Sequence, residues 1–389
     1  MKADPCAPGV PWTVMLDARY VSAEDSGIGR YTQELARWLP RLDPTLRLEL
    51  LCDPSRPDAN LGPDAPGVGF QVYGPPPNSL RTRFALARAV DLRGARLYHA
   101  PFNILPRGLR VPRVFTLHDI MWMHDVGLCT DVWWRKRVTG TFYRTLIPRA
   151  VAEARRILTV SQQSRADIEA RFPEARGRVH VTYNGVDPRF CPMPADAAWD
   201  LAARHIPRGV PFVLIVGQGA PYKNHPRAVA AFLDAFAALP TVRLVLVRRI
   251  SRSTDPTLRS LLAHPDLRGR VYALPHIDAP TLRALYSLAQ TFLFPSLYEG
   301  FGLPALEAMA CGAPVLTSRH GAPGEVCGPA ALTVDPRDVS SIAAGLRRLY
   351  DDPSLRADLR ARGLAHAATF TWERCARETL AVYRQALDD

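Results

Sequence analysis

Short apolar runs alternate with longer amphipathic stretches along most of this 389-residue chain. The runs have the length and composition of strands, and the stretches between them carry apolar residues at helical spacing. The predicted strands cover residues 12–16, 96–99, 113–117, 156–160, 179–183, 212–216, 242–247, 270–274, 291–294, 313–317 and 331–334. This alternation predicts an α/β fold of doubly wound parallel sheets that helices cover on both faces.

A turn-rich segment, residues 184–194, separates the two halves of the chain. We therefore expect one Rossmann-like domain over residues 1–190 and a second over residues 191–370, both of ordinary domain size. An amphipathic helix is predicted within residues 371–389.

Composition narrows the class of protein. Hydrophobic residues make up 47% and charged residues 22%, which is typical of a globular protein. We expect no membrane-spanning helix and no signal peptide, because neither an 18-residue apolar run nor an apolar N-terminal segment is present. Seven cysteines without compact spacing indicate a reducing compartment, so a cytoplasmic location is expected. No zinc site is expected, since CxxC and HExxH are missing.

The formal net charge is +12, and the first 190 residues carry 27 basic against 19 acidic residues. A chain with this positive charge can bind nucleic acid, anionic lipid or phosphorylated substrates. Residues 133–137 and 81–88 mix aromatic or apolar residues with cations, as segments drawn to an anionic membrane surface do. The same composition suits a solvated face or the wall of an acceptor site. No aromatic-basic recognition motif supports a nucleic-acid-binding protein.

The most informative stretch is residues 294–312, FPSLYEGFGLPALEAMACG. Glu299 lies on a loop after a predicted strand, and Glu307 lies in the first turns of the next helix, which Pro304 opens. Carboxylates accept hydrogen bonds from sugar hydroxyls, and a helix N-terminus binds phosphate, so this turn suits a sugar and an anion together. The alternative is an ordinary glycine-rich turn in which a glutamate merely suits the helix dipole.

Two candidate sites follow predicted strands of the first half. Gly27 and Gly29 stand in the string SGIGRY, where a tight turn would let the backbone approach a ligand closely. The string is not a complete GxGxxG motif, so dinucleotide binding is poorly supported, and a plain turn is the alternative. His118 and Asp119 end another strand, where a packed or capping histidine is the alternative to a catalytic one.

Two further candidates lie in the second half. Lys223 follows Gly217 and Gln218 at the start of a predicted helix, where its charge can bind a phosphate. The alternative is a solvated surface lysine. Asp278 suits contact with a base edge, although capping the next helix is the expected role.

Together, these strings resemble, in order, the motifs of the retaining glycosyltransferases of family 4, which have the two-domain GT-B fold. Glu299 and Glu307 match the E-x7-E signature. The resemblance implies that Glu299 faces the donor sugar and that Glu307 holds the ribose of the nucleotide. Other donor contacts that it implies are at Gly300, Phe301, Gly302 and Leu303. The final helix is implied to pack back on the first domain.

The resemblance gives roles to the remaining candidates. Gly27 and Gly29 would lie against the donor pyrophosphate and the acceptor, and Lys223 beside Gly217 would bind phosphate. Gln218 stands where the family usually has an arginine, so Arg248 or Arg249 is considered as the second phosphate ligand. His118 would touch the transferred sugar or its leaving oxygen, and Asp119 would orient the imidazole or bind an acceptor hydroxyl. Asp278 falls where the family grips the base.

The function implied is transfer of a hexose from a nucleotide-diphosphate sugar to a glycan or a lipid-linked acceptor. The strings look most like those of mannosyltransferases of surface polysaccharide assembly, which favours GDP-mannose first and a UDP-sugar second. No metal or other cofactor is expected, and the enzyme would work in the cytoplasm or on the inner face of the membrane. A glycosidase would need no phosphate-binding loops, whereas a nucleotide-sugar epimerase on the same fold remains the nearest alternative.

Overall fold

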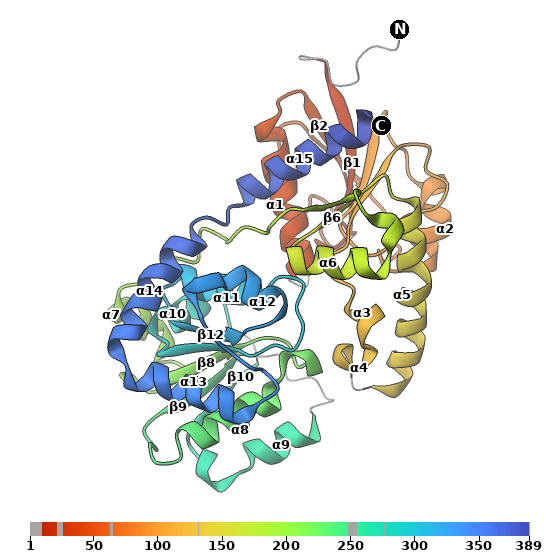
Figure 1. Ribbon diagram of the computed structural model, residues 1–389. Helices are drawn as coiled ribbons and strands as arrows, with labels where there is room; N and C mark the ends of the chain where they lie inside the picture. Colours follow the sequence, from red (N-terminus) through yellow and green to blue (C-terminus); the bar gives the residue numbers. More distant parts are fainter. Residues whose placement is uncertain are drawn as a thin grey trace. The chain divides into compact units, whose positions relative to one another are not determined.

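The chain folds into two compact units, each built on a parallel sheet (Figure 1). The computed structural model describes residues 10–21, 26–62, 65–130, 132–247, 255–275 and 277–388. The first unit comprises Met1–Ile120, Thr141–Gly185 and Thr371–Asp389, and the second comprises Met121–Gly140 and Val186–Phe370. The predicted α/β class is confirmed. The chain passes between the units at residues 185 and 370, where boundaries at 190 and 370 were expected from the sequence. Residues 121–140, which were expected in the first domain, belong to the second unit.

The first unit has a seven-stranded parallel sheet in the order β3-β2-β1-β4-β5-β6-β7. Its strands are β1 (Trp12–Asp17), β2 (Leu46–Cys52), β3 (Val68–Val72), β4 (Leu97–Ala100), β5 (Arg113–Thr116), β6 (Arg156–Thr159) and β7 (Val179–Val181). The sequence did not predict β2 and β3. Polar Arg47 and Glu49 interrupt β2, and β3 is an edge strand whose residues are all at least partly exposed, so neither segment is an apolar run.

The helices of the first unit are α1 (Gly27–Leu42), α2 (Leu80–Ala89), α6 (Gln162–Arg171), α15 (Trp372–Asp388) and the later part of α5 (Trp133–Glu153). Helix α15 packs beside α1 (Figure 1), where the Arg384 guanidinium lies 3.0 Å from the Asp43 carboxylate. The C-terminal helix is therefore part of the first unit although the second unit precedes it in sequence.

The predicted turn over residues 26–29 is wrong, because Gly27–Gly29 form the first turn of helix α1. The Ser26 hydroxyl accepts a hydrogen bond from the Gly29 N–H at 2.9 Å, as an N-cap does. A Cβ at Gly29 would lie 2.6 Å from the Tyr20 carbonyl oxygen. Glycine at this position therefore allows the loop between β1 and α1 to lie close to helix α1.

The second unit has a six-stranded parallel sheet in the order β10-β9-β8-β11-β12-β13. Its strands are β8 (Phe212–Val216), β9 (Arg243–Val247), β10 (Val271–Leu274), β11 (Thr291–Phe294), β12 (Val315–Ser318) and β13 (Leu332–Val334). Each matches a predicted strand within two residues. These runs are almost continuously apolar because helices cover both faces of the sheet.

Over the described ranges, the second unit contains ten α-helices besides the first residues of α5. They are α3 (Met121–His124), α4 (Val126–Cys129), α7 (Ala195–Ala202), α8 (His225–Ala235), α9 (Pro256–Leu262), α10 (Ala279–Leu288), α11 (Leu303–Ala310), α12 (Gly321–Cys327), α13 (Val339–Asp351) and α14 (Pro353–Ala367). Helices α11, α12 and α13 contact the sheet directly. One core joins Phe232 and Phe236 from the α8 region to Leu293 and Leu316 of the sheet. In the part of the chain that the structure describes, no helix is both long and apolar enough to cross a membrane.

Candidate functional site

A buried ion pair lies beyond the carboxyl ends of β8 and β11 in the second unit. The Lys223 Nζ is 2.7 Å from the Glu299 Oε1, and only 9% and 12% of the two side chains are exposed. The Ser296 hydroxyl donates to the same carboxylate oxygen at 2.8 Å. The ammonium also lies 4.8 Å from the ring centroid of Phe294, within range of a cation–π interaction. The alternative of a solvated surface lysine is therefore wrong.

The backbone around Lys223 joins three loops at this edge of the sheet. The 3₁₀ turn Pro221–Lys223 ends at Asn224, whose φ of 59° is left-handed. The Asn224 side-chain amide donates to the carbonyls of Pro295, at 3.0 Å, and Pro336, at 2.6 Å. These bonds tie the loop after β8 to those after β11 and β13, so the lysine and the glutamate are held by one framework.

Gly217, at the end of β8, lies directly beneath the lysine side chain. A Cβ there would come within 3.2 Å of the Lys223 Cδ, so a larger residue would displace the side chain that reaches Glu299. The neighbouring Gln218 is exposed. Arg248 and Arg249, considered as a second phosphate ligand, lie outside the described residues.

The turn into helix α11 depends on a glycine. Gly302 is the N-cap residue with φ 114°, a conformation that side chains with a Cβ rarely adopt. No side chain caps this helix. Pro304 has no N–H, and the Ala305 N–H donates to the Gly302 carbonyl at 2.9 Å, so the Leu303 N–H and the helix dipole are what this end offers to an anion. Phe301 is buried and packs edge-on against Phe370 with the ring centroids 6.1 Å apart, whereas Leu303 stays partly exposed. The buried Gly300 completes the segment from Glu299 to the helix.

Glu307 lies one turn further along α11 and is partly buried. The Tyr286 hydroxyl of α10 donates to its Oε2 at 3.4 Å. Burial raises the pKa of Tyr286 well above its usual value, so this hydroxyl keeps its proton. Tyr286 therefore acts as a donor that orients the Glu307 carboxyl group from one side.

Asp278 caps helix α10, as its sequence context led us to expect. Its Oδ1 accepts from the Thr281 N–H at 2.9 Å, and this bonding lowers the pKa of the carboxyl group. The side chain is exposed. One carboxylate oxygen is thus occupied by the cap, and contact of the other with a base stays a prediction.

His118 and Asp119 follow β5 in the first unit, where both are partly buried. The His118 Nε2 is 3.1 Å from the Pro101 carbonyl, which can only accept, so Nε2 carries the proton and Nδ1 a lone pair. Burial lowers the pKa of His118 to about 4, and the ring is neutral at pH 7. In this tautomer Nδ1 has no proton to donate to Asp119, so an imidazole oriented by Asp119 is not the arrangement found.

The sequence did not single out a buried chain of polar groups behind His118. His99 Nδ1 bonds to the Tyr383 hydroxyl at 2.6 Å, and His99 Nε2 bonds to the Thr116 hydroxyl at 2.9 Å. Thr116 in turn bonds to the Tyr31 hydroxyl, and the Tyr31 ring packs edge-on against His118 with centroids 5.0 Å apart. This chain links α15 and α1 to the strand end that carries His118. The sequence signal available was a histidine within an otherwise apolar strand.

The structure thus gathers the candidates into two groups. Gly217, Lys223, Glu299, Gly302 and Glu307 lie at the carboxyl edge of the second sheet. Gly27, Gly29, His118 and Asp119 lie at the carboxyl edge of the first sheet, in the other unit. Carboxyl edges of parallel sheets are where α/β proteins bind ligands.

Comparison with known proteins identifies the family of both halves of the chain. The family model "Glycosyltransferase Family 4" matches residues 26–190, and the model "Glycosyl transferases group 1" matches residues 200–366. The O-antigen chain mannosyltransferase B of Escherichia coli is 32% identical over 292 residues, which is 74% of either chain. Neither family model supports the epimerase alternative.

Solved structures share the fold. Sucrose-phosphate synthase from Thermosynechococcus elongatus has a TM-score of 0.74 at 23% identity, covering 97% of this chain and 98% of its own. HepE of Anabaena, solved with UDP and glucose, has a TM-score of 0.71 at 19% identity, covering 96% and 100%. The fold is that of the GT-B glycosyltransferases. Two family models in sequence order, and a relative that matches along most of its length, show that this chain belongs to glycosyltransferase family 4 and is a hexosyltransferase.

Proposed function

We propose that the protein transfers a hexose, with retention of anomeric configuration, from a nucleotide-diphosphate sugar to a glycan or lipid-linked acceptor. The observation that carries the proposal is the buried Lys223–Glu299 pair beside the uncapped N-terminus of α11. A cation and the positive end of a helix dipole suit a diphosphate, and two carboxylates suit the hydroxyls of a sugar and a ribose.

Lys223 and the start of α11 neutralise the charge that develops on the leaving diphosphate. Glu299 faces the transferred sugar and Glu307 holds the ribose. Donor binding exchanges part of the bond between Lys223 and Glu299 for a bond to phosphate. The ammonium then remains paired with an anion in its buried site, and the Glu299 carboxylate keeps the Ser296 hydroxyl and gains hydroxyls of the sugar.

Transfer breaks the bond between the anomeric carbon and the diphosphate oxygen, whose electron pair leaves with the diphosphate. The acceptor oxygen forms the new bond on the same face of the sugar, and its proton passes to the departing phosphate oxygen. No protein nucleophile and no metal ion is required by this scheme. The neutral His118 accepts a hydrogen bond at Nδ1 from a hydroxyl of the donor sugar.

We propose GDP-mannose as the donor and a UDP-sugar as the second candidate. The mannosyltransferase named among the relatives favours the first, and the UDP and glucose of the HepE structure favour the second. Thermal-shift measurements with GDP-mannose, UDP-glucose and ADP-glucose decide between them, since a ligand at 100 times its Kd adds about 2.7 kcal/mol of stability.

Turnover must then release the nucleoside diphosphate only when an acceptor is present, and the product must keep the donor's anomeric configuration by NMR. Nucleotide-sugar isomerisation without acceptor would instead identify an epimerase. Inversion of configuration would contradict the retaining scheme while leaving glycosyl transfer intact.

The acceptor is proposed to be lipid-linked and reached at an anionic membrane surface. Trp133 and Trp134, at the start of α5, are 71% and 49% exposed, and Lys136 and Arg137 follow them. Helix α2 exposes Leu80 and Phe84. Exposed aromatic side chains next to cations suit the interface of an anionic bilayer.

Flotation with phosphatidylglycerol vesicles at low salt tests this part of the proposal. The wild type should float with the vesicles and be released by salt. Trp134→Ala and Arg137→Ala should each reduce the bound fraction, and their effects should combine. A wild-type protein that stays in solution would contradict the membrane proposal and favour a soluble glycan acceptor.

A further inference from the structure

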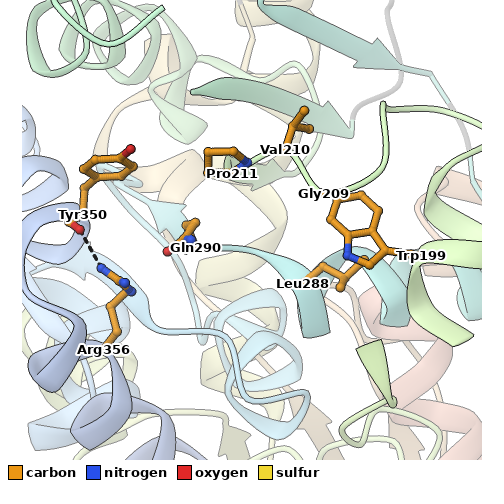
Figure 2. Close-up of a pocket in the computed structure, with 8 residues that line it drawn as sticks. All are labelled: Trp199, Gly209, Val210, Pro211, Leu288, Gln290, Tyr350 and Arg356. Atoms are coloured by element: carbon orange, nitrogen blue, oxygen red, sulfur yellow. Dashed lines mark hydrogen bonds between the residues drawn. The ribbon is translucent and has the colours of Figure 1, made fainter. Parts of the chain in front are cut away.

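A hollow lies in the second unit, at the opposite end of the strands from the candidate donor site. Its volume is about 500 Å³, and Trp199, Pro211, Gln290, Tyr350 and Arg356 are among the residues that line it (Figure 2). This volume is within the range of small-molecule sites. Nothing in the proposed transfer reaction uses any of these residues.

The hollow lies at the amino edge of the sheet. Strand β8 begins just after Pro211, and strand β11 begins just after Gln290, whose backbone N–H donates to the Phe212 carbonyl at 3.0 Å. The Lys223–Glu299 pair follows the opposite, carboxyl ends of these same two strands. A ligand in the hollow would therefore be separated from the donor by the length of the strands.

Two aromatic side chains form opposite walls of the hollow (Figure 2). The Trp199 ring of α7 packs edge-on against Phe212, with ring centroids 6.4 Å apart, and the Tyr350 ring of α13 packs against Phe236 at 5.4 Å. These contacts fix both rings while each remains partly exposed. Fixed, partly exposed aromatic rings offer an apolar surface at little entropic cost on binding.

Polar groups with unused bonding capacity accompany the two rings. Within the described ranges, the Trp199 indole N–H, the Gln290 side-chain amide and the Tyr350 hydroxyl have no hydrogen-bond partner. Together they supply both hydrogen-bond donors and hydrogen-bond acceptors. Arg356 is held in place, because its guanidinium donates to the carbonyls of Leu349, at 2.6 Å, and Tyr350, at 2.7 Å.

We propose that this hollow is a non-catalytic binding site for an oligosaccharide. The apolar C–H faces of pyranose rings pack against aromatic rings, and sugar hydroxyls both donate and accept, which the amide, the indole and the phenol can match. The residues lining the hollow include no carboxylate, so a cation is not favoured. A nucleotide is less well suited, because the only lining cation already bonds to two carbonyls.

Isothermal titration calorimetry with α-mannotetraose and with maltotetraose tests the site in the full-length protein. The wild type should bind one or both, and Glu307→Ala should bind equally well, because binding does not use the donor site. Trp199→Ala should weaken binding about tenfold or more, the scale of one lost aromatic contact and one lost hydrogen bond. Trp133→Ala removes an exposed tryptophan elsewhere on the chain and should change nothing.

Gln290→Ala gives a second test that does not depend on the aromatic packing. It removes only the side-chain amide, so the melting temperature should stay at the wild-type value while saccharide affinity falls severalfold. Nucleotide affinity should be unchanged in Trp199→Ala and Gln290→Ala. Saccharide binding that survives both Trp199→Ala and Gln290→Ala would overturn the proposal, as would binding to neither probe. Loss of nucleotide affinity in place of saccharide affinity would also overturn it.

Discussion

The carboxyl edges of the two sheets share a backbone architecture but differ in charge. In the second unit the edge holds the ion pair of Lys223 and Glu299, whose Nζ and Oε1 atoms are 2.7 Å apart. In the first unit a buried Asp17–Arg19 ion pair lies at the end of β1. The region after β5, called the neutral edge below, holds His118, whose ring is neutral and is backed by the uncharged chain from Tyr383 through His99. A diphosphate is bound by positive charge. A sugar hydroxyl can be bound by an uncharged acceptor such as the Nδ1 lone pair of His118. The Lys223–Glu299 pair therefore suits a diphosphate, and the His118 ring suits a sugar hydroxyl.

The cause of the difference is the presence or absence of a partner charge. Burial disfavours any charged group, but a neighbouring opposite charge restores it. Lys223 has Glu299 as such a partner. No carboxylate is hydrogen-bonded to the rings of His99 and His118 in the described part of the chain, and burial lowers their pKa values to about 3 and about 4.

The largest effect is expected at the neutral edge. His118→Ala should lower turnover about 10²-fold or more, the scale of one positioned transition-state contact. The melting temperature and the affinity for the nucleoside diphosphate should stay close to those of the wild type. An earlier unfolding transition with normal turnover of the folded fraction would show that the histidine only packs.

At the charged edge, Lys223→Ala should weaken binding of the nucleoside diphosphate by about 1.5–3 kcal/mol, the range for hydrogen bonds to charged groups. Binding of the nucleoside without phosphates should change little. Lys136→Ala, at the start of α5, removes the same charge elsewhere on the chain and is the matched control, which should keep the wild-type affinity. Equal loss of nucleoside and diphosphate binding would contradict a phosphate role for Lys223.

A smaller effect should separate the two carboxylates. Glu307→Ala should weaken nucleoside diphosphate binding roughly tenfold, because a ribose hydroxyl loses a charged acceptor. Glu299→Ala should largely spare that affinity and lower turnover. Titration calorimetry and steady-state rates on both variants test the division. Unchanged nucleotide affinity in Glu307→Ala would remove the ribose assignment.

The sequence predicted the second sheet better than the first because burial differs along the strands. The strands of the second sheet are mostly apolar in sequence, including the partly exposed edge strand β10, and such runs are recognisable without tertiary information. Strand β2 is interrupted by the exposed Arg47 and the partly buried Glu49, and β3 contains a glycine and a glutamine. Their pattern could be assigned only by knowing which strands lie next to them.

Motifs predicted where the site residues lie but not what they contact. Lys223 and Glu299 are separated by 76 positions, and their pairing depends on the loops that Asn224 ties together. The glycines of SGIGRY were expected in a ligand-binding turn, whereas Gly29 is required by the nearby Tyr20 carbonyl. The His118 tautomer is set by the Pro101 carbonyl, 17 positions earlier. Such contacts are decided by the packing of segments that are distant in sequence.

The last prediction uses acid to test the neutral edge. A histidine has a pKa near 6.5 when unfolded, so below that pH the unfolded chain takes up protons that folded His118 and His99 resist. Stability should therefore fall as the pH drops from about 6.5 through 4, and further toward 3. The melting temperature of His118→Gln should fall less steeply over this window than that of the wild type. His264→Gln removes an exposed histidine and should keep the wild-type slope. Identical slopes in all three proteins would mean that His118 is not held neutral by the fold, and the contrast between the two edges would lose its electrostatic basis.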